Sequence, residues 1–458
     1  MFTQRVETDL FAASALFFSF FVHHNPIFSV WLGGVRPISR DRNQGKTNSR
    51  KFGFLPQTSS GKDLHAKMNQ QLKKIVSEKK DVVEDMMDVF EKGAEMVASI
   101  AGDLFPIFSV AAPLVQLALD NVESSEAAFM KDQFQKVRDR LDVVSEEIQR
   151  INEEIKKSRI DTEFFSVEEN IRNQFRKYME ILNAKPQFTE VKKQNFLKHF
   201  SKSGGNKNLH SLYSVVVGDG FFGEPLLVTI LNYEEKSRRP IEEYCARLKN
   251  LFCIGIIALL GHAAVDGFNE GEELLKEWAE KMTNVQEKIN AVVEECIVSF
   301  PNQAKTDCER LVRDQEGLDN KQLADALIGI LKKKYDWVGW SVRVYKSQSS
   351  ILPTKKKFDC PTGKSRFQVT TSNEKLNIWV SYSASPEPLD KNLIQELIQS
   401  QKKPTVENVA ENLFEKLPGD CMVHTVKSSK DLVCSWSFTD DLHYWEEHKN
   451  LHVCVHSA

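Results

Sequence analysis

The sequence predicts a mainly α-helical fold, a long-helix bundle with coiled-coil-like seams, followed by a small C-terminal α+β domain. Apolar residues between 134 and 155 recur at alternating spacings of three and four, and a second stretch, 274–296, repeats this spacing. Beyond Tyr335 the apolar period falls from about four to two. A helix with one narrow apolar seam must bury it against other helices. The seams comprise Phe134, Val137, Leu141, Val144, Ile148, Ile151 and Ile155, and Leu274, Trp278, Met282, Val285, Ile289, Val292 and Cys296.

Length and composition indicate a soluble globular chain. Its 458 residues are enough for two or three domains, and 41% apolar with 27% charged residues is typical of a packed protein. A net charge of −3 argues against nucleic-acid binding. The eight cysteines form no C-x-x-C pair, as expected for reduced thiols of a cytoplasmic protein.

The amino terminus offers an alternative location. The apolar run from Leu10 to Val22 has the length of a signal-peptide core and is too short to span a bilayer. Only Arg5 precedes it, against Glu7 and Asp9, so the expected positive segment is missing. Secretion or membrane association is therefore the alternative to the cytoplasm. We expect residues 1–67 to be a disordered extension, because 36–67 are polar and lack an apolar period.

The bundle is expected to span residues 68–334. Ser124 and Ser125 precede the first seam helix, which should end near residue 158, and Ser166 with Glu169 is interpreted as a capping box that starts the next helix. Pro240 is expected at a kink or in a first turn, and Pro301 at the end of the second seam helix. Further helical segments are predicted at 72–100, 104–119, 189–200, 209–217, 226–264, 270–299 and 323–331.

The terminal α+β domain is expected to span residues 335–458. Segments of alternating polarity predict strands at 337–345, 367–371, 376–383, 421–426, 432–438 and 451–456. Short helices are predicted at 390–400 and 405–417. This order of elements indicates an α+β domain that is separate from the bundle.

No residue is predicted to be catalytic, to bind a cofactor or to ligate a metal. The segment 360–365 (CPTGKS) ends like a phosphate-binding loop, but Phe358 occupies the position where that loop needs glycine. Paired glutamates beside the seams, such as Glu153 and Glu154, are interpreted as solvated faces or ion pairs.

A histidine cluster near the end of the chain leaves two interpretations open. His452, Cys454 and His456 would share one face of a strand, which is compatible with a zinc-dependent enzyme. The paired close ligands typical of structural zinc are missing, so we expect these residues, with His443 and His448, to be surface histidines.

Two apolar stretches, 104–119 and 251–265, also have two interpretations. They fit the central buried layer of a bundle, which we favour because Pro106 and Pro113 suit a packed, kinked element. The alternative is a membrane-inserting hairpin, as in helical pore-forming proteins.

Four stretches resemble the rapunzel family of bony-fish proteins. They are 166–182 (SVEENIRNQFRKYMEIL), 94–119, 248–261 (LKNLFCIGIIALLG) and 337–345 (WVGWSVRVY), in the same order as in the family. The resemblance covers about residues 68–458, and 1–67 depart from it. It implies a vertebrate protein associated with fin and skeletal development, without a known reaction, cofactor or catalytic residue.

The function expected from these observations is non-enzymatic and depends on binding an unidentified protein partner. The repeated seams and the lack of a coherent active site motivate this hypothesis. A bundle that inserts into membranes is the alternative.

Overall fold

The computed structural model describes residues 66–70, 72–78, 108–157, 161–218, 225–267, 271–315, 317–346, 357–369, 371 and 376–458. Side chains are described for these residues except 161–163. The apolar run from Leu10 to Val22, the extension 1–67 apart from its last two residues, and most of the predicted helix 72–100 lie outside this set. Residues 66–70 and 72–78 are helical, and Leu72 is fully buried in the bundle core.

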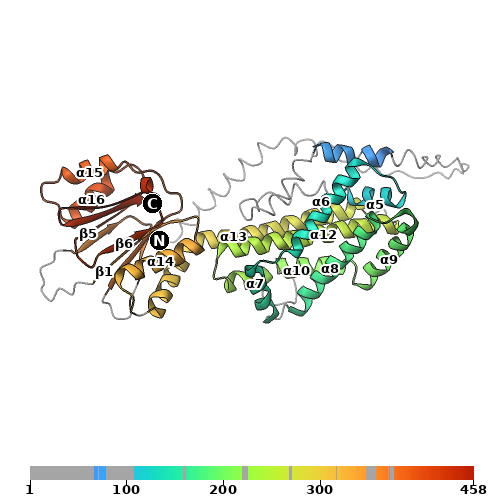
Figure 1. Ribbon diagram of the computed structural model, residues 1–458, viewed down its shortest axis with the longest axis horizontal. Helices are drawn as coiled ribbons and strands as arrows, with labels where there is room; N and C mark the ends of the chain where they lie inside the picture. The colour runs from blue at the N-terminus through green and yellow to red at the C-terminus, as the bar shows by residue number, and fades with distance from the viewer. Residues whose placement is uncertain are drawn as a thin grey trace, which may run out of the picture. The chain divides into compact units, whose positions relative to one another are not determined.

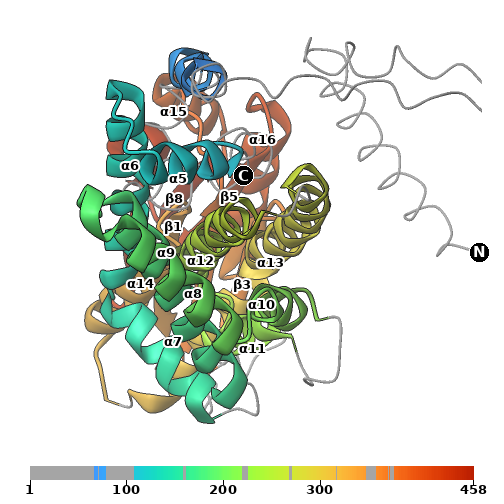
Figure 2. The same ribbon diagram turned by 90° about the vertical axis from the view of Figure 1, so that its right-hand side faces the viewer.

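A helical bundle occupies the described chain as far as the middle of α13 (Figures 1 and 2). Its central element is α12 (Arg238–Asp266), which packs against α5, α6, α7, α8, α9, α10 and α13. Every residue from Leu251 to Gly261 is buried, because this part of α12 is apolar on all faces. The surrounding helices are α5 (Ala111–Leu119), α6 (Ser125–Asp142), α7 (Glu146–Lys157), α8 (Asp161–Leu182), α9 (Thr189–Lys202), α10 (Lys207–Val217), α11 (Leu226–Tyr233) and α13 (Gly271–Asp314).

The first seam is buried as predicted, but it belongs to two helices. The chain leaves α6 at Val143, which has an extended backbone, and restarts as α7 after Ser145. The Ser145 hydroxyl accepts a hydrogen bond from the Ile148 amide at 3.1 Å, and two glutamates follow in the first turn of α7. Val144 is consequently 49% exposed, against the prediction that it lies in the seam.

The predicted capping box at Ser166 is wrong. Ser166 lies inside α8, which begins at Asp161, and Glu168 is buried. Arg247 on α12 forms an ion pair with Glu168 at 2.5 Å, so this carboxylate serves helix packing. The helix buries one apolar stripe, which comprises Val167, Ile171, Phe175, Tyr178, Ile181 and Leu182.

The predicted end of the second seam helix at Pro301 is also wrong. Helix α13 continues through Pro301 to Asp314, although proline cannot donate the usual hydrogen bond to the Ile297 carbonyl. Phe300, Ala304 and Cys308 are buried at four-residue spacing, and this burial favours continuation of the helix. Pro240 lies in the first turn of α12, where a proline is tolerated.

The second half of α13 belongs to a different core. From Phe300 onward it packs with α14 (Asn320–Lys334) and with strands β1, β3 and β4. This second cluster of apolar residues crosses residue 335, where the sequence analysis placed a domain boundary. The domain limits at 67 and 334 remain predictions.

The C-terminal region has four layers: helices, two sheets and helices. One sheet has the strand order β3-β4-β1-β6 and the other β2-β5-β8-β7, and every pairing is antiparallel. Helices α13 and α14 cover the first sheet, while α15 and α16 cover the second (Figure 1). The elements are β1 (Gly339–Lys346), β2 (Asp359–Thr362), β3 (Arg366–Val369), β4 (Leu376–Ser383), α15 (Lys391–Gln399), α16 (Val406–Lys416), β5 (Cys421–Lys427), β6 (Val433–Trp436), β7 (His443–His448) and β8 (Leu451–Ser457). The predicted mainly α fold with an α+β C-terminal part is thus confirmed, and strands β2 and β7 are additional.

Candidate functional site

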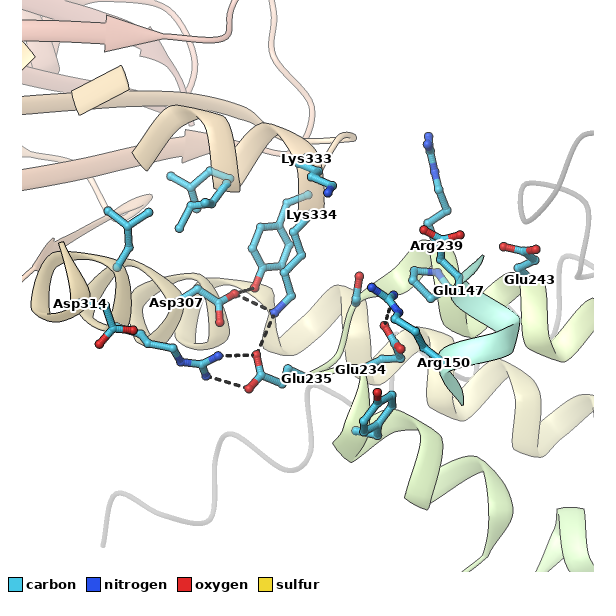
Figure 3. Close-up of a pocket in the computed structure, with 18 of the residues that line it drawn as sticks. Glu147, Arg150, Glu234, Glu235, Arg239, Glu243, Asp307, Asp314, Lys333 and Lys334 are labelled. Carbon is cyan, nitrogen blue, oxygen red and sulfur yellow. Dashed lines mark hydrogen bonds and ion pairs between the residues drawn. The ribbon is translucent and has the colours of Figure 1, made fainter. Parts of the chain in front are cut away.

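A charged cleft of about 960 Å³ lies where the bundle meets α13 and α14 (Figure 3). Its walls come from α7, the turn between α11 and α12, the start of α12, the second half of α13 and the end of α14. The charged side chains that line it are Glu147, Arg150, Glu234, Glu235, Arg239, Glu243, Asp307, Arg310, Asp314, Lys333 and Lys334. Charged groups of both signs can select a partner of complementary charge.

Ion pairs fix the middle of this cleft. The Arg310 guanidinium donates a hydrogen bond from Nη1 to Glu235 Oε2 at 2.9 Å, and its Nη2 lies 2.8 Å from Oε1 of the same carboxylate. Lys334 Nζ lies 2.7 Å from Asp307, whose same oxygen accepts a hydrogen bond from the Tyr335 hydroxyl at 2.7 Å. These contacts hold the α11–α12 turn against α13 and α14.

Glu234 is a deeply buried carboxylate of the cleft, with only 8% of its side chain exposed. Burial raises its pKa, and Arg150, 3.6 Å away, partly opposes this shift. A carboxylate with a raised pKa is the one feature of the described cleft that resembles an acid–base group. No cysteine or histidine stands among the described lining residues.

Three lining charges form no ion pair with any described residue. Glu147 and Glu243 stand on the bundle wall, while Lys333 is exposed on the α14 wall. The remaining charges are engaged with one another, except that Arg239 pairs with Asp336 and Asp314 with Arg313. The cleft therefore offers two carboxylates on one wall and an ammonium group on the other.

A second candidate is the layer between the two sheets, which is polar where a sandwich is usually apolar. Arg343 on β1 is fully buried, and its Nη1 donates to the hydroxyl oxygens of Ser341 at 3.1 Å and Ser381 at 2.8 Å. The alternation in Trp340–Tyr345 places Ser341, Arg343 and Tyr345 on one face of β1. This alternation of polar residues is the signal in the sequence that indicates a polar face.

The expectation of surface histidines is wrong for part of the cluster. His456 is fully buried and His443 nearly so, whereas His448 and His452 are half-buried. His456 Nδ1 donates to the Ser457 carbonyl at 2.6 Å, so its Nε2 accepts from the Ser381 hydroxyl at 2.7 Å. The rings of His443 and His456 both stack on Phe438.

The described residues contain no group of three or more His, Cys, Asp or Glu that could hold a metal ion. His452 stacks on Trp445 and faces Glu447, away from the partners of His456. The arrangement needed for a zinc-dependent enzyme is therefore not assembled by His452, Cys454 and His456.

The segment 360–365 and the paired glutamates have structural roles in the fold. Gly363 turns with a φ of +89° between β2 and β3, so the segment 360–365 joins two strands and does not precede a helix. A phosphate-binding loop needs a helix amino terminus at that place. Glu153 and Glu154 pair with Lys156 and Lys157, as the interpretation of the paired glutamates predicts.

Comparison with known proteins shows which protein family this chain resembles. Residues 121–317, from the end of α5 to the turn after α13, match the model of the cephalotoxin-like middle helical domain. The chain is also 37% identical to protein rapunzel of the zebrafish, Danio rerio, over 201 residues, which are 44% of this chain and 88% of that protein. The chain therefore belongs to the rapunzel family. No solved structure matches it.

One described helix, α12, is long and apolar enough to cross a membrane by length and composition. Its most apolar window is 89% buried within the fold, as the interpretation of residues 251–265 as a buried layer predicts. In the other apolar stretch, 104–119, residues 104–107 lie outside the described set. Most of residues 108–119, which include α5, are buried.

Proposed function

We propose that this rapunzel-family protein is non-enzymatic and cytoplasmic, and that it acts by binding a protein partner in the charged cleft. The observation that carries the proposal is the pattern of unpaired charge in that cleft. Most charged groups there are neutralised within the fold, which leaves Glu147, Glu243 and Lys333 for an incoming chain. We also propose that the protein is associated with fin and skeletal development, as the resemblance to the family implies.

Charge complementarity defines the partner. A segment that carries a lysine or arginine near Glu147 and Glu243, and an aspartate or glutamate near Lys333, would satisfy all three groups. Such pairs in a partly enclosed cleft fix orientation and select partners more than they add affinity. The partner is thus a polypeptide segment with one basic and one acidic side chain.

The ion pairs also favour binding over catalysis. Asp307 and Glu235 are held by Lys334, Arg310 and Tyr335, and carboxylates held in this way serve structure and not proton transfer. Glu234, although its pKa is raised, forms an ion pair with Arg150.

A peptide library tests this function with the full chain as bait. We expect enriched peptides to carry a basic and an acidic residue at a recurring spacing. The double variant Glu147→Lys/Glu243→Lys should weaken binding at least tenfold, and peptides with the basic residue changed to an acid should bind this variant better than they bind the wild type. Retention of full affinity by the double variant would contradict the proposal.

Matched controls separate the cleft from general charge effects. Glu287 on α13 and Lys198 on α9 are exposed and lie outside the cleft. Glu287→Lys and Lys198→Glu should leave peptide binding unchanged, whereas Lys333→Glu should remove the preference for an acidic residue.

Membrane insertion is the second candidate, because α12 has the length and composition of a membrane span. Insertion would require α12 to leave its contacts with seven other helices. Leakage of dye from anionic vesicles, measured at neutral and acid pH, distinguishes the candidates. We expect no leakage; leakage that depends on the apolar stretch of α12 would favour insertion.

A further inference from the structure

The layer between the two sheets contains a buried positive charge that needs an anion. Arg343 has no exposed surface, and its guanidinium stays protonated in proteins. A buried charge is costly unless an opposite charge compensates it. Its hydroxyl partners Ser341 and Ser381 are neutral, and its Nε and Nη2 atoms have no hydrogen-bond partner in the described structure.

The acidic group in contact with this guanidinium is a thiol. Arg343 Nη1 lies 3.2 Å from Sγ of Cys454 on β8. On its other side the same sulfur lies 3.5 Å from His443 Nε2 and 3.7 Å from the Ser341 hydroxyl oxygen. Sγ of Cys434 on β6 lies 3.7 Å from that hydroxyl oxygen as well. One sulfur is thus surrounded by a cation, an imidazole and a hydroxyl group.

We propose that Cys454 is a thiolate that serves as the counter-ion of Arg343, and that it is a modification site for hydrogen peroxide. The thiolate sulfur attacks one peroxide oxygen, so that an S–O bond forms and the O–O bond breaks. The sulfur is oxidised to a sulfenic acid, and the released hydroxide takes one proton from solvent and leaves as water.

The pKa values agree with this geometry. Burial raises the pKa of the Cys454 thiol, but the Cys434 thiol, the Arg343 guanidinium and His443 outweigh burial and hold it well below its usual range. Burial raises the pKa of Cys434, which therefore remains a thiol. Other charged or titratable groups near this site are Tyr345 on β1, Asp359 on β2, Arg366 on β3, His424 on β5 and His456 on β8.

The bundle supplies matched internal controls. Cys245, Cys253 and Cys296 are as deeply buried as Cys454, but burial raises the pKa of each to about 12. They share the burial of Cys454 and have no arginine in contact with sulfur among the described side chains. A difference in oxidation therefore reports the electrostatic surroundings and not access alone.

The test treats the folded full-length protein with hydrogen peroxide at pH 6, removes the peroxide with catalase, and unfolds the chain in urea with dimedone. Peptide mass spectrometry then gives the sulfenic acid content of each cysteine. A sulfenic acid at Cys454 can also condense with the neighbouring Cys434 thiol, with loss of water, so a Cys434–Cys454 disulfide counts as oxidation of Cys454. We expect Cys454 to be oxidised, as dimedone adduct or as this disulfide, at least tenfold more than Cys245, Cys253 and Cys296. Equal oxidation, or weaker oxidation of Cys454, would overturn the proposal.

A second measurement detects the thiolate directly, without treatment with peroxide. Thiolate absorbance near 240 nm, followed from pH 9 to pH 5, should show one thiolate that persists below pH 7 in the wild type and is missing in Cys454→Ser. Arg343→Lys should retain this thiolate, and Arg343→Met should lose it. Identical titration curves for the wild type and Cys454→Ser would overturn the proposal even if the arginine variants fail to fold.

Discussion

Glu235, in the turn between α11 and α12, accepts a hydrogen bond from Arg310 on the second half of α13 and forms an ion pair with it. The neighbouring residue Lys236 forms an ion pair of 2.6 Å with Glu295 on the first half of the same helix. Pro301 lies between these two attachment points. Both turn residues have positive φ angles, 47° and 61°, a conformation that costs energy for residues with side chains. The turn thus bridges the position at which α13 lacks a backbone hydrogen bond.

The first prediction concerns this bridge. Glu235→Gln and Arg310→Met should each lower the free energy of unfolding by roughly 0.5–1 kcal/mol, because both side chains are partly exposed and solvent weakens the pair. The double variant should cost less than the sum of the single variants. Urea denaturation at low and high salt measures these values, and a double-mutant cycle without coupling would show that the pair adds nothing.

The seam between 134 and 155 shows how far the sequence could predict the fold. Its spacing identified six buried residues, because a helix and the bundle core impose the same period. It could not show the break at Val143, since the helix restarts after three residues and the apolar spacing continues across the gap. The available signal was Ser145 followed by Glu146 and Glu147, which is a typical helix start.

The candidate sites were harder to predict than the fold. The cleft is built from α7, α11, α12, α13 and α14, and its charged residues are too distant in the sequence to form a motif. Arg343 and Cys454 meet only because two sheets face each other. The burial of His443 and His456 depends on the same packing, which alternation within one strand does not reveal.

The second prediction compares two neighbouring positions of the seam. Ile148 is 4% exposed, so Ile148→Asp places a carboxylate in the core and should cost roughly 3–5 kcal/mol. Val144 is 49% exposed, so Val144→Asp should change stability by less than about 0.5 kcal/mol. Thermal and urea unfolding of both variants measures the difference. Similar losses for the two variants would mean that residue 144 is buried after all.

The third prediction concerns the close contact between α12 and α8. A Cβ atom added at Gly261 would lie 2.3 Å from the Tyr178 ring, which cannot move freely because its hydroxyl donates to the Ala111 carbonyl at 2.8 Å. Gly261→Ala should therefore destabilise the bundle by about 1–3 kcal/mol. Gly329 on α14 has open space around it, so Gly329→Ala should stabilise by about 0.5–1 kcal/mol. Chemical denaturation that finds Gly261→Ala neutral would show that the two helices can separate at little cost.

The fourth prediction is a loss of stability in mild acid. Burial lowers the pKa of both His424 and His456 to about 4, whereas the ordinary value is about 6.5. Between these values the unfolded chain binds protons that the folded chain does not, so stability falls as the pH falls from 6.5 toward 4. Each histidine contributes roughly 3 kcal/mol to this loss. Urea unfolding followed by tryptophan fluorescence at pH 7 and pH 5 measures it. His456→Gln should reduce the pH dependence of stability clearly, whereas His452→Gln, at a half-buried ring, should reduce it only slightly. Equal stability of the wild type at pH 7 and pH 5 would contradict the burial of neutral histidines between the sheets.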